Sequence, residues 1–191
     1  MLGLLTACGG SQAPAQTPKV PSETVSEEVA TPVITEAEVV AAQQGWCDAL
    51  LKINAEYKAR GKEEAKELAG QVLDQAYAYQ QGVVLFKPTL AFGSQTFRLD
   101  KEGALAYFAG GNDKYPDDSG FALKGWTKCE IKNAGVHLSG DMALTMGHVV
   151  FTDEGGKVTT VDKTWGFKKD AQGAIRIVLH HSSLPYQPAS D

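Results

Sequence analysis

Three hydroxyl side chains from well-separated segments could share one small ligand. Thr89 follows a short apolar run and a proline, Tyr107 lies in a short helical segment, and Ser182 lies near the end of the last β-prone run. Because a hydroxyl both donates and accepts hydrogen bonds, the three could surround a small planar oxyanion with no covalent step. Taken singly, each is more often a turn, core or solvated residue. The pattern therefore suggests an anion site and leaves the structural alternative open.

Two of the four histidines are adjacent near the C-terminus. Side chains alternate between the two faces of a strand, so His180 shares a face with Ser182 while His181 points to the other face. The two imidazoles cannot readily share one metal ion from a regular strand. A metal would need a further ligand such as His148 or His137. From the residues alone a mononuclear zinc site is possible but unsupported. We predict that the protein uses no metal and no cofactor.

Other catalytic and binding signatures are absent from the sequence. The chain contains no Cys-x-x-Cys, His-Glu-x-x-His, Gly-x-Ser-x-Gly or phosphate-binding Gly-x-x-x-x-Gly-Lys-Ser/Thr motif. Lys and Arg are scattered and the net charge is -5, which argues against nucleic-acid binding. The carboxylates of Asp113, Asp117 and Asp118 fall in a polar loop, so no carboxylate is evidently placed to act as a base. A small-molecule partner is the remaining expectation.

The first half of the chain is predicted to be mainly helical. Apolar residues recur every three and four positions in two stretches, which is the spacing of a buried helical face. Thr35 with Glu38 suits the start of the first helix, and Gly61 suits its end. The predicted elements are helices over Thr35–Arg60 and Lys62–Tyr79, short strands at Val83–Phe86 and Thr96–Arg98, and a small helix over Asp100–Phe108.

The last third of the chain is predicted to form hairpins. Clusters of Gly, Asp and Ser separate four β-prone runs, roughly 122–133, 142–152, 158–168 and 174–183. Helices followed by an antiparallel meander define an α+β fold in which the helices cover one face of a curved sheet. Such an arrangement leaves a pocket between the helices and the sheet.

The N-terminus resembles the end of a bacterial lipoprotein signal. Leu5-Thr6-Ala7-Cys8 is similar to a lipobox, in which cleavage precedes Cys8 and the thiol carries the lipid. We expect residues 1–8 to be a signal remnant whose true start lies upstream, 9–33 a disordered polar tether, and 34–191 the catalytic domain. No apolar run is long enough to span a bilayer. The expected location is the periplasm, with membrane contact only through Cys8 at the outer membrane.

Two further cysteines could pair. In an oxidising compartment, Cys47 and Cys129 could form a disulfide. Their spacing matches no metal motif, and both lie beside large apolar residues, so two buried free thiols remain equally compatible with the sequence.

A family resemblance extends from Thr35 to Pro188. The chain is similar over this range to the iota-class carbonic anhydrases, especially their metal-free bacterial and algal branch. The ending from Leu179 to Pro185 is the most recognisable part, although metal-using relatives share a similar His-His-Ser-Ser ending. The matching segments are Val84–Thr89, Gly103–Gly111, Gly120–Trp126, Ala143–Gly147 and Leu179–Pro185.

This resemblance implies a fold, an activity and a site. The fold would be the cone-shaped nuclear-transport-factor-2-like (NTF2-like, SnoaL-like) fold, with a homodimer expected by analogy. The activity would be interconversion of carbon dioxide and bicarbonate, with the anion held by the residues that match the family's Thr, Tyr and Ser, namely Thr89, Tyr107 and Ser182. We further expect His180 to accept or relay the proton. The expected apolar walls are Phe86, Leu90 and Phe108.

Two other functions remain possible at this stage because one fold hosts many chemistries. An isomerase or dehydratase of the same fold would use a buried Asp base together with a Tyr. A non-catalytic binding or assembly module, similar to the association domain of calmodulin-dependent kinase, would show no hydration of carbon dioxide.

Overall fold

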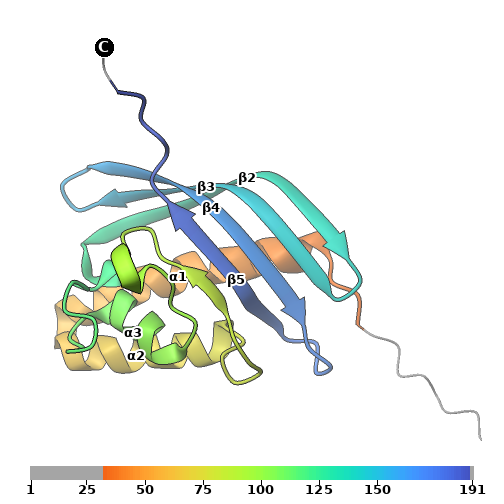
Figure 1. Cartoon of the computed structure of the whole chain (residues 1–191), viewed down its shortest axis with the longest axis horizontal. Helices are drawn as coiled ribbons and strands as arrows, with labels where there is room; N and C mark the ends of the chain where they lie inside the picture. Colours follow the sequence, from red (N-terminus) through yellow and green to blue (C-terminus); the bar gives the residue numbers. More distant parts are fainter. Residues whose placement is uncertain (1–31, 190–191) are drawn as a thin grey trace, which may run out of the picture. The chain divides into compact units, whose positions relative to one another are not determined.

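Three helices pack on one face of a five-stranded sheet in the computed structural model, which describes residues 32–189 (Figure 1). This arrangement confirms the predicted α+β class. The helices are α1 (Glu36–Arg60), α2 (Lys62–Ala76) and α3 (Lys101–Ala109), and the strands are β1 (Leu85–Lys87), β2 (Trp126–Ser139), β3 (Met142–Asp153), β4 (Val158–Lys169) and β5 (Ile175–Ser183).

Helix α1 begins at the predicted capping residue. The Glu38 amide donates to the Thr35 hydroxyl at 3.3 Å, and the Thr35 amide donates to the Glu38 carboxylate at 2.9 Å, which completes a capping box. The helix ends at Gly61, whose φ of 106° is unfavourable for a residue with a side chain. Its buried face also carries Gln43 and Asn54, and the Asn54 side chain donates to the carbonyl of Trp126 at 3.1 Å. These polar contacts fix α1 against the start of β2.

The sheet combines a meander with one parallel strand. Its order is β1-β5-β4-β3-β2, in which β2 to β5 are antiparallel and β1 pairs with β5 in parallel. The register places Phe86 opposite His180 and Lys87 opposite His181. Because β1 runs alongside the end of β5, the segment that follows β1 is brought to the segment that follows His180. The hydrophobic pattern of the sequence predicted the meander but not this parallel pairing.

Several predicted boundaries differ from the structure, since α2 ends at Ala76 rather than Tyr79 and β1 is Leu85–Lys87 rather than Val83–Phe86. Residues 96–98 form no strand; Gly93–Gln95 is a short 3₁₀ helix, and Arg98 makes one backbone hydrogen bond, to Phe86 at 2.8 Å. The side chain of Arg98 is buried although the segment forms no strand. The β-like pattern of residues 96–98 therefore did not indicate a strand. Residues 121–123 form another 3₁₀ turn, and β2 therefore starts later than predicted and continues to Ser139.

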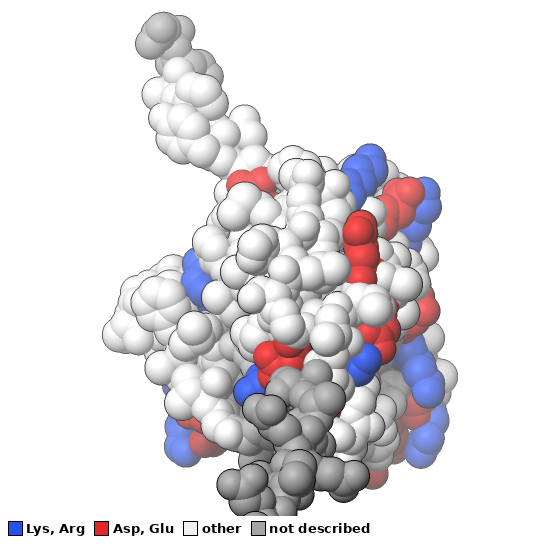
Figure 2. Space-filling model, turned by 90° about the vertical axis from the view of Figure 1, so that its right-hand side faces the viewer, with Lys and Arg blue, Asp and Glu red and all other residues white. Residues whose placement is uncertain are grey.

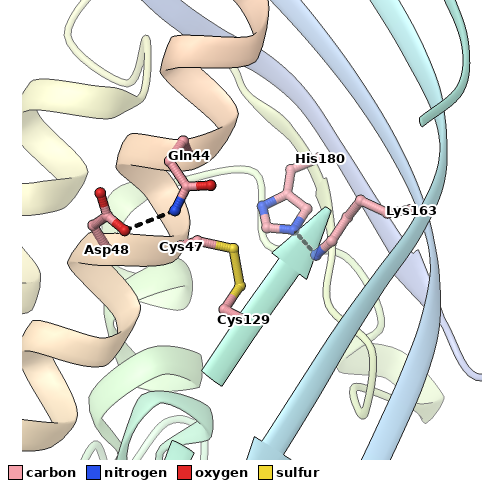
Figure 3. Close-up of a disulfide and its surroundings, with 6 residues drawn as sticks. All are labelled: Gln44, Cys47, Asp48, Cys129, Lys163 and His180. Atoms are coloured by element: carbon pink, nitrogen blue, oxygen red, sulfur yellow. Dashed lines mark hydrogen bonds between the residues drawn. A yellow bond between two sulfur atoms is a disulfide. The ribbon is translucent and has the colours of Figure 1, made fainter. Parts of the chain in front are cut away.

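The core lies between α1 and the inner face of the sheet. Trp46 from α1 contacts Phe151 of β3 and Trp165 of β4 edge-on, with ring centroids 6.3 and 5.7 Å apart. The side chains of Cys47 and Cys129 form a disulfide that joins α1 to β2 (Figure 3). Closing a loop with a sequence separation of 82 contributes about 4.5 kcal/mol in the chain-entropy account. The bond resolves the question that the sequence left open.

The described part of the chain contains no helix that is long and apolar enough to cross a membrane. Cys8 and the predicted tether up to residue 31 lie outside the described residues, so the predictions made for them stay predictions. On the face shown in Figure 2, acidic and basic side chains are interspersed rather than gathered by sign.

Candidate active site

Thr89 and Ser182 meet at the end of the parallel β1–β5 pair. Their hydroxyl oxygens are 2.6 Å apart, although the residues are 93 positions apart in the chain. Ser182 is buried, and its carbonyl oxygen accepts a hydrogen bond from the Lys87 ammonium at 2.9 Å. Since either hydroxyl can donate to the other, one hydroxyl hydrogen of the two remains available to a ligand.

Tyr107 places a third hydroxyl at the same site. It lies on α3 with 5% of its surface exposed, and its Oη has no hydrogen-bond partner among the described residues. Burial raises the pKa of the phenol, while the polar groups of Thr89 and Leu90, which lie near Oη without forming a hydrogen bond of normal geometry, lower the pKa to a smaller extent. Tyr107 therefore keeps its proton at neutral pH. A buried donor with no partner is costly unless a ligand accepts its hydrogen bond.

A small pocket lies on one side of Tyr107. Its volume is about 40 Å³, and its walls include Leu90, Phe92, Arg98 and Asp118. A single water needs on the order of 10–15 Å³, so the pocket has room for a ligand of a few heavy atoms. Carbon dioxide and bicarbonate have this size.

The pocket wall contains a carboxylate that the sequence analysis did not place there. The Asp118 side chain is 7% exposed and accepts two hydrogen bonds from the Arg98 guanidinium, at 2.5 and 3.2 Å. Arg98 also stacks over the Tyr115 ring at 4.2 Å. Both carboxylate oxygens are engaged, so Asp118 is poorly placed to act as a free base. Arg98 and Asp118 are 20 residues apart in the sequence and meet only in the folded chain. The sequence alone therefore showed Asp118 only as one acidic residue of a polar loop.

His180 lies behind the hydroxyls in an aromatic environment. It is 1% exposed, and its Nδ1 is 2.8 Å from Tyr77 Oη. Its Nε2 is 2.7 Å from Lys163 Nζ (Figure 3). Burial lowers the pKa of this imidazole well below its usual value, and the charges of Lys163 and His181 act in the same direction. His180 is therefore neutral, with both ring nitrogens in contact with protein groups.

The predicted apolar walls divide into two sets. Leu90 lines the pocket, whereas Phe86 and Phe108 are buried beside His180, and Phe86 stacks on the imidazole with centroids 4.6 Å apart. Contact of these two phenylalanines with the substrate stays a prediction.

Sequence reasoning also missed Lys163. This lysine is 4% exposed on β4, on the inward face of the strand that buries Val161 and Trp165. The alternation of inward and outward residues along the strand could have identified Lys163, because a lysine at an inward position of a strand is unusual.

The two adjacent histidines occupy opposite faces of β5. His180 is buried, whereas His181 is exposed, as strand alternation predicted. His148 lies 3.2 Å from Asp162 at partly exposed positions. The described residues contain no cluster of three or more His, Cys, Asp or Glu side chains able to hold a metal ion.

The fold and the pocket define an α+β protein of the NTF2-like class. A solved member of the NTF2-like family from Streptomyces avermitilis superposes with a TM-score of 0.50 at 16% identity, covering 79% of this chain and 96% of that chain. This likeness concerns the fold alone.

The relationship to one family is much closer. A family model described as metal-independent carbonic anhydrase matches residues 37–184. A metal-independent carbonic anhydrase from Nostoc sp. is 54% identical over 168 residues, which cover 86% of this chain and 82% of the relative. The crystal structure of a cyanobacterial iota-carbonic anhydrase complexed with bicarbonate superposes with a TM-score of 0.81 at 52% identity, covering 91% of this chain and all of that chain. The chain belongs to the metal-independent carbonic anhydrase family, which confirms the resemblance noted in the sequence.

Proposed function

We propose that the protein interconverts carbon dioxide and bicarbonate at the site formed by Thr89, Tyr107 and Ser182. The observation that carries this proposal is the contact between the Thr89 and Ser182 hydroxyls near Tyr107, a buried donor that lines the small pocket and has no hydrogen-bond partner among the described residues. Membership of the family supports the reaction, and the bicarbonate complex of the cyanobacterial relative supports the substrate.

The hydroxyls suit the charge that develops during hydration. Water attacks the carbon of carbon dioxide, and negative charge grows on the oxygens of the forming bicarbonate. Hydrogen bonds from Tyr107 and from the Thr89–Ser182 pair would stabilise these oxygens in a water-poor site. The phenol is well suited because its raised pKa keeps the donor proton in place. The contribution is electrostatic and positional, with no covalent intermediate.

His180 is the proposed proton acceptor or relay. Its neutral imidazole lies two residues before Ser182 on the same inward face of β5. A proton must leave the attacking water, and His180 can take it up when a partner of its ring nitrogens, Tyr77 or Lys163, shifts a proton at the same time.

Hydration by the purified protein after exhaustive chelation tests this function. Stopped-flow measurement should show carbon dioxide hydration that chelation does not abolish and that added zinc or manganese does not increase. Activity that is lost on chelation and returns with one metal would contradict the metal-independent mechanism, and a folded protein without any hydration activity would contradict the function itself.

The competing functions lack a comparable observation. An isomerase-like mechanism needs a free carboxylate base, and the carboxylate of Asp118 is held by Arg98. A non-catalytic module needs no unpartnered hydroxyl donor beside its pocket.

We also propose that the enzyme is exported and anchored by a lipid on Cys8 in the periplasm. The lipobox-like Leu5–Cys8 segment supports this location, as does the Cys47–Cys129 disulfide, since such bonds persist in oxidising compartments. With a complete signal sequence, the mature protein should partition into detergent, and Cys8→Ser should prevent it. Lipid labelling that persists in the Cys8→Ser variant would contradict the assignment.

A homodimer through the outer face of the sheet is a further proposal. Leu144 and Met146 of β3 expose 47% and 64% of their surfaces on that face, and apolar groups of this kind suit an interface. Sedimentation equilibrium should give twice the monomer mass, and Met146→Lys should shift it towards the monomer. A monomer at all concentrations would exclude the dimer.

A further inference from the structure

Lys163 is a buried lysine without an acidic partner among the described residues. Its Nζ lies 2.7 Å from His180 Nε2 and over the rings of Trp46 and Trp165, at 4.6 and 5.1 Å from their centroids. Burial lowers the pKa of the amine well below its usual value. The indole faces favour the charged form. The amine is therefore able to exist in either state.

Hydrogen bonding couples the charge of Lys163 to the tautomer of His180. A neutral imidazole donates from one ring nitrogen and accepts at the other. Tyr77 Oη, which accepts from Trp46 Nε1 at 2.9 Å, lies 2.8 Å from Nδ1. If Lys163 is a neutral amine, Nε2–H can donate to Nζ and Tyr77 can donate to Nδ1. If Lys163 is an ammonium, it donates to Nε2, and the ring hydrogen must lie on Nδ1. The two states differ by one proton.

This pair lies directly behind the hydroxyl site. Lys163 is opposite Ser182 in the β4–β5 register, and both side chains are buried on the inner face of the sheet. Directly opposed residues on one face have Cβ atoms roughly 5 Å apart. Ser182 in turn shares its hydrogen bond with Thr89.

The titratable groups around the pair come from several elements. Tyr77 follows α2, Tyr107 lies on α3, Lys87 ends β1, and His181 lies on the outer face of β5. The carboxylate of Asp162 lies 3.2 Å from His148 at partly exposed positions. Burial raises the pKa values of both tyrosines and lowers those of Lys87 and His181. Of these groups, Lys163 and His180 are in direct contact through their nitrogen atoms, and the lowered pKa of Lys163 means that it titrates at a lower pH than a free lysine.

We propose that Lys163 is a positioning residue that sets the tautomer of His180, and that the two residues together hold the proton released during hydration. The inference rests on the proposed function and deepens it.

The proton balance is simple. A lone pair of the water oxygen forms the new C–O bond, one C=O π pair moves to oxygen, and one O–H pair remains on the former water oxygen as its proton leaves. The Lys163–His180 pair gains that proton, becomes cationic and carries its ring hydrogen on Nδ1. Solvent then receives the proton. Dehydration of bicarbonate runs in reverse and requires the protonated pair.

Nitrogen-15 NMR of ring-labelled histidine in the folded full chain tests the coupling directly. The signal of His180 should show a neutral ring that changes from the Nδ1–H to the Nε2–H tautomer as pH rises, with a midpoint well below the 10.5 of a free lysine. Lys163→Met should remain Nε2–H throughout, because Tyr77 still donates to Nδ1. Lys168→Met, exposed on the same strand, should behave as the wild type. The same tautomer behaviour in wild type and Lys163→Met would overturn the coupling.

Hydration kinetics test the proton-holding role. The pH profile of kcat should inflect at the midpoint of the tautomer change, and Lys163→Met should lose this inflection and at least about 10-fold in kcat, with KM changed much less. An unchanged profile in folded Lys163→Met would overturn the role. If Lys163→Met does not fold, Lys163→Gln offers the same test, since an amide contacts Nε2 but does not titrate. A wild-type protein without activity would defeat the proposed function, whereas the NMR comparison would still decide the coupling.

Discussion

Arg98 and Lys163 are both buried basic side chains near the hydroxyl site, and their partners differ. Arg98 donates to both oxygens of Asp118 and to the carbonyl of Gln95 at 2.8 Å. Lys163 contacts one imidazole nitrogen and two indole faces. The charge of Arg98 has hydrogen-bond acceptors for its donors, so it stabilises the loops around the pocket. Lys163 has no acidic partner among the described residues, so burying its amine lowers the free energy of unfolding. The difference suits Arg98 to a structural role and Lys163 to the proton-holding role proposed for it.

The largest expected effect on stability comes from breaking the complete pair. Arg98→Met leaves the Asp118 carboxylate buried without its counterion, and it should lower the free energy of unfolding by about 3–5 kcal/mol. Urea denaturation measures this loss. Arg60→Met is the matched control, because Arg60 is exposed and pairs with Glu56 on the helix surface, where such pairs contribute about 0.5 kcal/mol or less. Equal losses in the two variants would mean that Arg98 has no special structural role.

Removing the unpartnered hydroxyl should affect activity rather than stability. Tyr107→Phe deletes one buried oxygen and keeps the ring that stacks on Phe121 at 5.5 Å, so the fold should persist. We expect kcat/KM for hydration to fall on the order of 100-fold, or about 3 kcal/mol in the transition state. Tyr186→Phe, at a position 85% exposed, serves as the control.

The other two hydroxyls extend this test. Thr89→Val and Ser182→Ala should show losses similar to that of Tyr107→Phe, and the combined losses should not add, because the three groups act on one anion. Full hydration activity in folded Tyr107→Phe would assign the phenol to the core alone.

The smallest effect concerns the pH dependence of stability. In the folded state the pKa of Lys163 is lowered, whereas in the unfolded chain it returns to about 10.5. Between these values unfolding takes up a proton, so lower pH favours the unfolded state. The stability of the wild type relative to Lys163→Met should therefore increase with pH by about 1.4 kcal/mol per unit within that window. Paired urea titrations at several pH values measure the slope, and parallel curves would show that Lys163 is protonated in both states.

Local patterns predicted most of the elements. The capping residues Thr35 and Glu38 and the end at Gly61 located α1, and the turn clusters located three of the four hairpin strands within one residue. Capping and turn formation depend on residues that are neighbours in the chain, so they can be predicted without knowledge of the tertiary structure. The largest failures were Thr96–Arg98 and the start of β2, where burial of Arg98 and a 3₁₀ turn overrode local β propensity. The end of α2 and the bounds of β1 also differ by two or three residues at most.

By itself, the sequence indicated the order of the main elements and the family, and it pointed to the three hydroxyl residues through their matching motifs. It also determined that His180 and His181 face opposite sides, because strand alternation is local. The tertiary structure decided which groups share an environment. The parallel pairing of β1 with β5 joins Thr89 to Ser182, and burial on one face joins Lys163 to His180. Hydrogen bonding and pKa values depend on groups close in space, and those groups lie 17 to 93 residues apart in this chain.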